Sequence, residues 1–142
     1  MIKQSQLIAG AIVYVKDVVP PGKGRTKARR VVLLNHVDEH DTFRYAVIAT
    51  NRNPSRELLE TEVRISHHEK GHPQTSLTEP SVVVCHWVQE ANIMRAMSRK
   101  GYCPALEFNE VLRAVAVAAD YQKNDSGRAG DPRNSKHQRP PK

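Results

Sequence analysis

The order of its short apolar runs constrains the fold of this 142-residue chain more than any other feature. Each run is rich in β-branched residues and is long enough for one pass across a small sheet. Segments that are polar or contain Pro and Gly separate the runs, as expected of connections between neighbouring strands. The five predicted strands are residues 11–18, 30–35, 43–49, 61–65 and 81–88.

The hydrophobic period changes after the last of these runs. Residues 91–97 predict a short helical turn, and Pro104 stands where a longer helix can begin, because the first turn needs no N–H there. Apolar residues then recur at helical spacing, which predicts one stripe packed on a sheet. This pattern predicts a mainly β (α+β) protein, a small antiparallel barrel with a short helix and a C-terminal helix. The stripe consists of Phe108, Val111, Leu112, Val115 and Ala119.

The end of the chain has a different composition. Residues 122–142 contain no Val, Ile, Leu, Met, Phe, Tyr or Trp, but they carry six Lys or Arg. Such a segment cannot bury enough apolar surface to offset its chain entropy. We therefore expect one folded domain over residues 1–121 and a basic, disordered tail over residues 122–142.

Positive charge dominates the chain, with a formal net charge of +7. This balance favours a polyanionic partner, most often a nucleic acid. Residues 19–28 are expected to form a Pro/Gly loop, and residues 19–30 carry five basic residues and no acid. No N-terminal run has the pattern of a signal peptide, and none is long enough to span a bilayer. A soluble, cytoplasmic protein is expected.

Cysteine and histidine do not predict a metal or redox site. Two cysteines make no disulfide framework. His67, His68 and His72 lie close together, but their spacing matches no strict zinc motif and no Cys is near them. We expect neither a metal nor a cofactor.

Several segments follow one another in an order that is similar to the PemK/MazF family of toxins. A Gly and an apolar strand come first, followed by a Pro/Gly loop, an Arg, and a second strand. An apolar strand that ends in Thr comes next, and the last part holds a strand, a short helix and a final helix. The resemblance covers about residues 8–119. The matching segments are residues 10–15, Arg29 with 31–34, 47–50, 80–88, Lys100 with Gly101, and Pro104.

The resemblance implies an SH3-like barrel of the PemK/MazF/CcdB kind and a symmetric homodimer. It also implies ribonuclease activity at the dimer surface and neutralisation by a cognate antitoxin of a type II toxin–antitoxin system. The chain departs from the family pattern in its basic tail after residue 121 and at two places near the first loop. Arg30 stands where a Pro is usual, and Gly22, Lys23 and Gly24 stand where many members have Gly-Ser-Glu.

Metal-independent cleavage of RNA uses the neighbouring 2′-hydroxyl as nucleophile and leaves a 2′,3′-cyclic phosphate. A protein assists by holding the backbone in line and by stabilising charge on the phosphate oxygens. A guanidinium suits this role because its planar fork donates two hydrogen bonds, and a Thr hydroxyl adds another. Arg29 and Thr50 are the predicted catalytic residues, since the resemblance and the strand ends place both at one rim.

The remaining predicted contacts are basic or polar side chains along the path of the phosphate backbone. His36, His40 or His86 has a suitable pKa range for a general base, but the sequence selects none of them. The predicted RNA-binding residues are Lys23, Arg25, Lys27, Arg30 and Asn51.

The sequence therefore predicts an endoribonuclease toxin that cuts single-stranded RNA, such as mRNA, at specific sequences. Two alternatives use the same fold: a non-catalytic protein that binds RNA or DNA, and an inhibitor of DNA gyrase.

Overall fold

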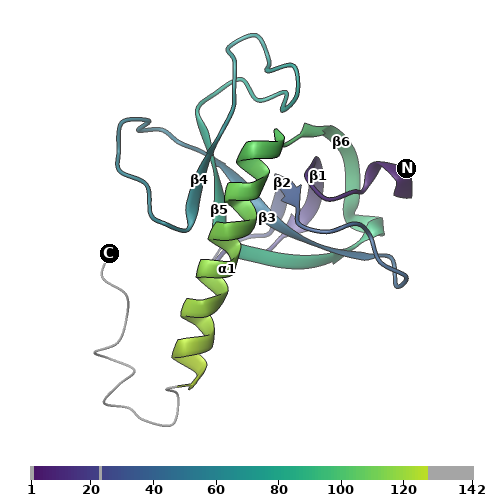
Figure 1. Ribbon diagram of the computed structural model, residues 1–142. Helices are drawn as coiled ribbons and strands as arrows, with labels where there is room; N and C mark the ends of the chain where they lie inside the picture. Colours follow the sequence, from purple (N-terminus) through teal and green to yellow (C-terminus); the bar gives the residue numbers. More distant parts are fainter. Residues whose placement is uncertain (1, 23, 128–142) are drawn as a thin grey trace.

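A six-stranded antiparallel sheet forms the body of the protein, and one long helix stands beside it (Figure 1). The computed structural model describes residues 2–22 and 24–127. The sheet has the order β4-β5-β3-β2-β1-β6. Its strands are β1 (Ala11–Val18), β2 (Lys27–Leu33), β3 (Thr42–Thr50), β4 (Glu62–Ile65), β5 (Ser81–Asn92) and β6 (Ala96–Tyr102).

The predicted fold class is confirmed, although the sheet does not close into a complete barrel. β4 and β6 are its two edges, and within the described residues no ladder joins them. The loop after β4 partly spans the gap, because Tyr102 N donates a hydrogen bond of 2.8 Å to Gln74 O. β4 has only four residues, too few to carry a continuous ladder to the opposite edge.

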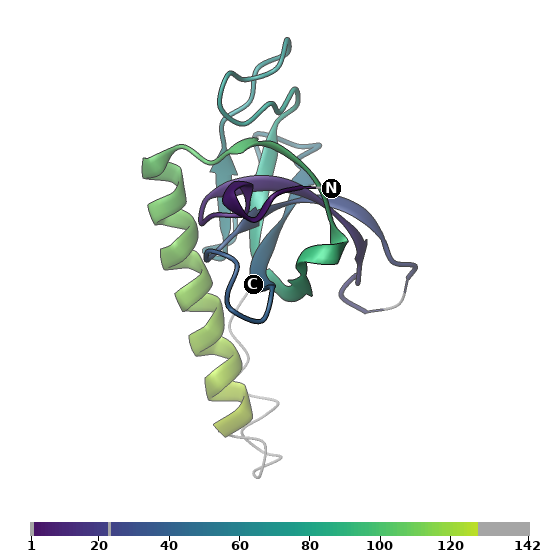
Figure 2. The ribbon, with the colours of Figure 1, turned by 90° about the vertical axis from the view of Figure 1, so that its right-hand side faces the viewer.

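Both faces of the central strands are buried, because apolar side chains point alternately to the two sides. One face holds Val13, Val15 and Phe43, and the segment around the 3-10 helix η1 (Gln4–Gln6) packs there through Leu7. The other face holds Ile12 and Val83, among others, and is covered by the helix. Figure 2 shows the helix on one side of the sheet only. The sheet therefore separates two apolar layers.

The segment after β5 differs from the structure predicted for it. A helical turn was predicted for residues 91–97, but only Ile93–Arg95 form a 3-10 turn (η2), and β6 begins at Ala96. β6 was not predicted because it is an edge strand with one buried side chain, Ala96. Its sequence therefore lacks the apolar alternation that marks half-buried strands.

The C-terminal helix α1 spans Ala105–Gly127. Pro104 precedes it, and its carbonyl accepts a hydrogen bond from Phe108 N. Val111 is buried against the sheet, whereas Leu112 of the predicted stripe is exposed. The helix continues beyond residue 121, so the boundary between domain and tail remains a prediction, and residues 128–142 lie outside the described residues. No helix in the described part of the chain is long and apolar enough to cross a membrane.

Candidate functional site

The main candidate site is a cavity of about 400 Å³ at the ends of β2 and β3. The ladder between these strands covers only Leu33↔Tyr45 to Val31↔Val47, so nearer the rim the strands are not paired with each other. Basic and hydroxyl-bearing side chains dominate its wall. The lining residues are Tyr14, Lys27, Ala28, Arg29, Arg30, Ile48, Ala49, Thr50, Arg52, Leu77, Thr78, Glu79 and Ser81.

Arg29 and Thr50 both line this cavity, but strand alternation sends their side chains to opposite faces. Arg29 pairs with Val15, whose side chain belongs to the layer away from α1. There its guanidinium stacks on Trp87, with Cζ 4.9 Å from the ring centroid. Thr50 has the parity of Ile48, which faces α1. The guanidinium predicted for catalysis is therefore held on the other side of the sheet.

Arg30 shares the face of Thr50. It pairs with Tyr14, two residues after Ile12, and Ile12 packs in the layer under α1. Thr50 closes β3 with an exposed side chain and pairs with Ser81 on β5. The structure therefore places Arg30, which the sequence had assigned to RNA binding, with the predicted catalytic hydroxyl.

The two arginines have donor groups without acceptors. The Nε atoms of Arg29 and Arg30 are buried, and neither finds a hydrogen-bond partner among the described residues. Buried N–H groups are nearly always paired, and a guanidinium donates preferentially to carboxylate or phosphate oxygens. Neither Nε is open to solvent and the two lie on opposite faces of the sheet, so a single anion in this cavity does not account for both.

The other predicted RNA contacts are distributed unevenly. Lys27 lines the cavity and Arg25 is exposed in the loop before it. Lys23 lies outside the described residues. Asn51 is buried, 5% exposed, and its Oδ1 accepts a hydrogen bond of 3.1 Å from Arg56 Nε. The structure therefore gives the Asn51 side chain a packing and loop-holding role.

Arg56 in turn fixes the segment between β3 and β4. Its two terminal nitrogens donate to Glu62 Oε1 and Oε2 at 2.8 and 3.0 Å. These bonds to the guanidinium lower the pKa of Glu62. A bidentate pair of this kind holds its geometry well, and it anchors the loop that begins at Asn51 and carries Arg52.

Sequence reasoning missed several residues of the cavity. Tyr14 presents an aromatic ring there, with Lys100 Nζ 5.8 Å from its centroid. Arg52 and Glu79 come from loops whose position no periodic pattern reveals. Only Tyr14 could have been placed from sequence, because it lies two residues after the apolar Ile12 in the same strand and its side chain therefore points to the same face.

None of the three histidines considered as a base lines this cavity. His36 Nδ1 accepts a hydrogen bond from Ala9 N, and His86 Nδ1 is 2.7 Å from Thr61 Oγ1. His40 is exposed beside Glu39. In the loop after β4, His68 and His72 use Nδ1 to accept backbone N–H groups. These imidazoles therefore hold local structure.

Neither cysteine has the properties of a reactive thiol. Both are buried free thiols. Burial raises the pKa of Cys85 to about 12, and it raises the pKa of Cys103 to about 12 as well. Only the thiolate is a good nucleophile, so neither residue is prepared for reaction at neutral pH.

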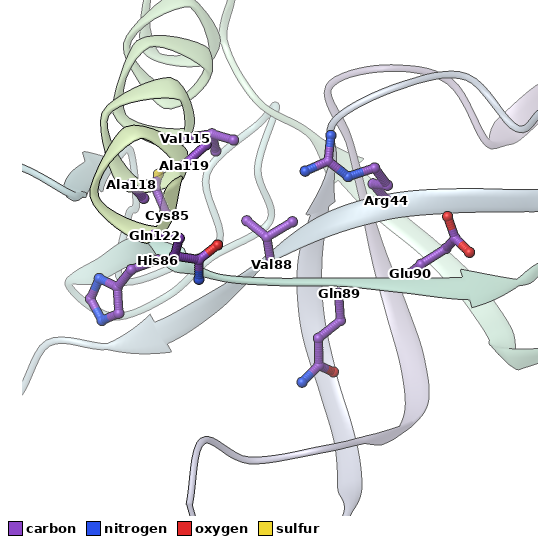
Figure 3. A pocket seen from close by; sticks show the side chains of 10 residues that line it. All are labelled: Arg44, Cys85, His86, Val88, Gln89, Glu90, Val115, Ala118, Ala119 and Gln122. Carbon is purple, nitrogen blue, oxygen red and sulfur yellow. The ribbon is translucent and has the colours of Figure 1, made fainter. Parts of the chain in front are cut away.

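A second cavity, of about 270 Å³, lies between α1 and the bent part of β5 (Figure 3). Val115, Ala118, Ala119 and Gln122 of α1 face His86 and Val88 of β5 across it, and Arg44 and Glu90 lie at one side. Its charges are mixed, with one guanidinium and one carboxylate. The cavity at the ends of β2 and β3 has four basic side chains and is therefore better suited to a polyanion.

The loop before β2 is fixed to β5 by side chains. Trp87 Nε1 donates to Val19 O at 3.0 Å, and Gln89 Nε2 donates to the same oxygen at 2.7 Å. Gln89 Oε1 accepts from Val19 N at 3.3 Å and from Tyr45 OH at 3.0 Å. Trp87 therefore joins the start of the basic loop, through Val19, to its end, through Arg29.

Replacing Trp87 by alanine is expected to release this loop. The substitution removes the cation–π contact, worth about 0.5–2 kcal/mol, and a hydrogen bond worth about 1 kcal/mol. Limited trypsin digestion should then cut after Arg25 several-fold faster than in the wild type. Trp87→Phe keeps a ring under Arg29 and should give an intermediate rate; equal rates in all three proteins would contradict the anchoring role.

Comparisons with known proteins identify the fold. No protein-family model matches the sequence, and no curated protein matches it. Among solved structures, the Mycobacterium tuberculosis toxin MazF-mt6 is 23% identical, with a TM-score of 0.55 over 78% of this chain and 96% of that one. MazF of Deinococcus radiodurans is 14% identical, with a TM-score of 0.61 over 80% and 96% of the two chains.

A third similar structure is an endoribonuclease from a mycobacterial species, in complex with its cognate antitoxin. It is 13% identical, with a TM-score of 0.57 over 80% of this chain and 94% of that chain. Identities this low establish the fold only. The chain has the MazF toxin fold, as the sequence resemblance predicted.

Proposed function

We propose that this chain is a toxin of the PemK/MazF type that cleaves single-stranded RNA without a metal ion. The observation that carries the proposal is the convergence of Arg30, Thr50, Lys27 and Arg52 on one cavity at the sheet rim. Solved structures of the same fold include named endoribonucleases.

The proposed reaction is an in-line attack by the 2′-oxygen on the adjacent phosphorus. The new bond joins that oxygen to phosphorus, the bond to the 5′-oxygen breaks, and a 2′,3′-cyclic phosphate remains. Arg30 and Thr50 donate hydrogen bonds to the non-bridging oxygens, whose negative charge grows in the transition state. A guanidinium keeps its proton at neutral pH, so Arg30 acts as a stabiliser of charge.

Arg29 takes a supporting part in this scheme. Stacked on Trp87, it adds positive charge at the cavity wall and holds the base of the loop. Lys27 and Arg52 guide the backbone on either side, and Tyr14 offers a ring for a base. Lys23 and Arg25 extend the path along the loop, and Asn51 supports it from within.

The proposal includes a cytoplasmic homodimer that an antitoxin neutralises. A mycobacterial endoribonuclease in complex with its cognate antitoxin and MazE-MazF of Deinococcus radiodurans, which share the fold, support the antitoxin partner. Expression without an antitoxin should arrest growth, and co-expression of the cognate antitoxin should restore it.

The test is cleavage of single-stranded RNA by the purified protein in EDTA. The expected products end in a 2′,3′-cyclic phosphate and a 5′-hydroxyl. Thr50→Val removes only the hydroxyl and should lower kcat about 100-fold, in line with the loss of one donor to the transition state. Thr50→Ser keeps the hydroxyl and serves as the matched control.

Two other outcomes would change the assignment. A protein that binds RNA or DNA with steep salt dependence, yet cuts no sequence in a randomised RNA pool, is a nucleic-acid binder on this fold. Arrest of DNA replication with intact RNA would favour inhibition of gyrase.

A further inference from the structure

One carboxylate lies among the basic residues of the candidate site. Glu79 is the single acidic residue among the described residues that line the cavity of Arg30 and Thr50. Its side chain forms no hydrogen bond or ion pair with any residue in the part of the chain that the structure describes. The Glu79 side chain is exposed and shares the cavity with Arg30 and Arg52 without pairing with either, so its carboxylate is free to accept a hydrogen bond or a proton.

Strand geometry fixes the place of Glu79. Thr50 pairs with Ser81, and Asn51 N donates to Pro80 O at 2.8 Å. The antiparallel pairing therefore extends to Asn51 and Pro80, and Glu79 lies two residues before Ser81, the partner of Thr50, at the bend where the loop enters β5. Ser81 Oγ donates to Glu79 O at 2.9 Å, which holds the backbone at this position.

Hydrogen bonds to Ser66, which in turn is bonded to α1, also hold the loop that carries Glu79. Thr75 is fully buried, and its hydroxyl donates to Ser66 O and accepts from Leu77 N. Ser66 N donates to Glu107 Oε1 on α1 at 2.9 Å. The carboxylate is thus presented by a loop that is attached to both the sheet and the helix.

We infer that Glu79 is the general base of the cleavage reaction and takes the proton from the attacking 2′-hydroxyl. This inference rests on the proposed function. The proton moves to the Glu79 carboxylate as the bond from the 2′-oxygen to phosphorus forms. The bond from phosphorus to the 5′-oxygen breaks, and solvent water supplies the proton that the leaving oxygen needs.

The other side chains of the cavity are poor bases. Guanidinium and ammonium groups hold their protons at neutral pH, and hydroxyl groups are weak proton acceptors. A carboxyl group in water is ionised at that pH and accepts hydrogen bonds only. Glu79 also comes from the loop after β4, whereas the family's acidic residue is expected in the first loop, where this chain has Gly22, Lys23 and Gly24.

The experiment compares Glu79→Gln and Glu79→Ala with the wild type on one RNA that the wild type cuts. Loss of a general base lowers the rate about 10²–10⁴-fold, so kcat should fall by at least 100-fold in both variants. KM should stay within about twofold, because the guanidinium groups remain. Formate, a small carboxylate, should restore part of the activity of Glu79→Ala and none of that of Glu79→Gln.

Glu69→Gln is the matched control, since Glu69 is an exposed acid of the same loop outside the cavity. It should cut like the wild type. Wild-type rates in Glu79→Gln would overturn the assignment of the base and leave the nuclease intact. A fall in kcat without formate rescue, matched by Arg52→Ala, would also overturn it and make Glu79 a positioning residue. Absence of cleavage by the wild type would instead refute the proposed function.

Discussion

Replacing Arg30 by alanine is expected to lower kcat/KM for RNA cleavage about 10²–10³-fold, as found when a donor to a developing oxyanion is removed. Arg30 lies on the face of Thr50 and has a buried Nε without an acceptor. The corresponding change at Arg29 should cost about tenfold or less, because that guanidinium is stacked on Trp87 on the opposite face. Steady-state cleavage of a short RNA by both variants provides the comparison.

Lysine variants separate charge from geometry at these two positions. Arg30→Lys keeps the positive charge but loses the planar fork, so it should recover RNA binding and little of the rate. Arg29→Lys should behave nearly like the wild type, since an ammonium also interacts with the ring of Trp87. A severe loss in Arg29→Ala together with normal cleavage by Arg30→Ala would return the catalytic role to Arg29.

The sequence did not reveal which face of the sheet Arg29 and Arg30 each occupy, and the reason is physical. In β2, Val31 and Leu33 are buried on one face and Val32 on the other, so the strand is apolar on both sides. Period-two alternation identifies a face only when the other face is polar. The sequence therefore located a basic strand end correctly, whereas its orientation required the cross-strand partners, Val15 and Tyr14.

The positions of β1 and β3 along the chain, in contrast, could be predicted from sequence. β1 was predicted over its full length, and β3 to within one residue at each end, because their apolar β-branched runs are bounded by turn residues. β6 was not predicted because, apart from Ala96, its residues are not buried. At such positions the contacts with neighbouring segments determine the conformation, and no local sequence pattern indicates it.

Among the cavity residues, those at strand ends could be predicted from sequence and those in loops could not. Lys27, Arg30 and Thr50 sit at strand ends and were identified from sequence, and the proposed function exchanges the parts of Arg29 and Arg30. Arg52 and Glu79 lie in loops just beyond the last residue pair of β3 and β5, and both line the cavity. Loop residues of this kind carry function but follow no periodicity, so only the three-dimensional arrangement reveals them.

Replacing Gly101 by alanine is expected to reduce the free energy of unfolding by about 2–4 kcal/mol. A Cβ at this position would lie 2.1 Å from Gln74 O and about 3 Å from two further backbone atoms of the loop after β4. Backbone cannot rotate away as a side chain can, so the loop must move. Overpacking typically costs about 1–3 kcal/mol, and the lost bond from Tyr102 N to Gln74 O adds about 1 kcal/mol. Urea denaturation measures the change.

This substitution should also slow RNA cleavage, although Gly101 does not line the cavity. The displaced loop carries Thr78 and Glu79, which do line it, and catalytic groups tolerate little displacement. Ser98→Ala on the same strand is the control and should change stability by less than about 0.5 kcal/mol. If Gly101→Ala unfolds at the wild-type urea concentration, the close approach of β6 to the loop does not hold. If it is destabilised but cleaves RNA normally, the loop is not what positions the catalytic groups.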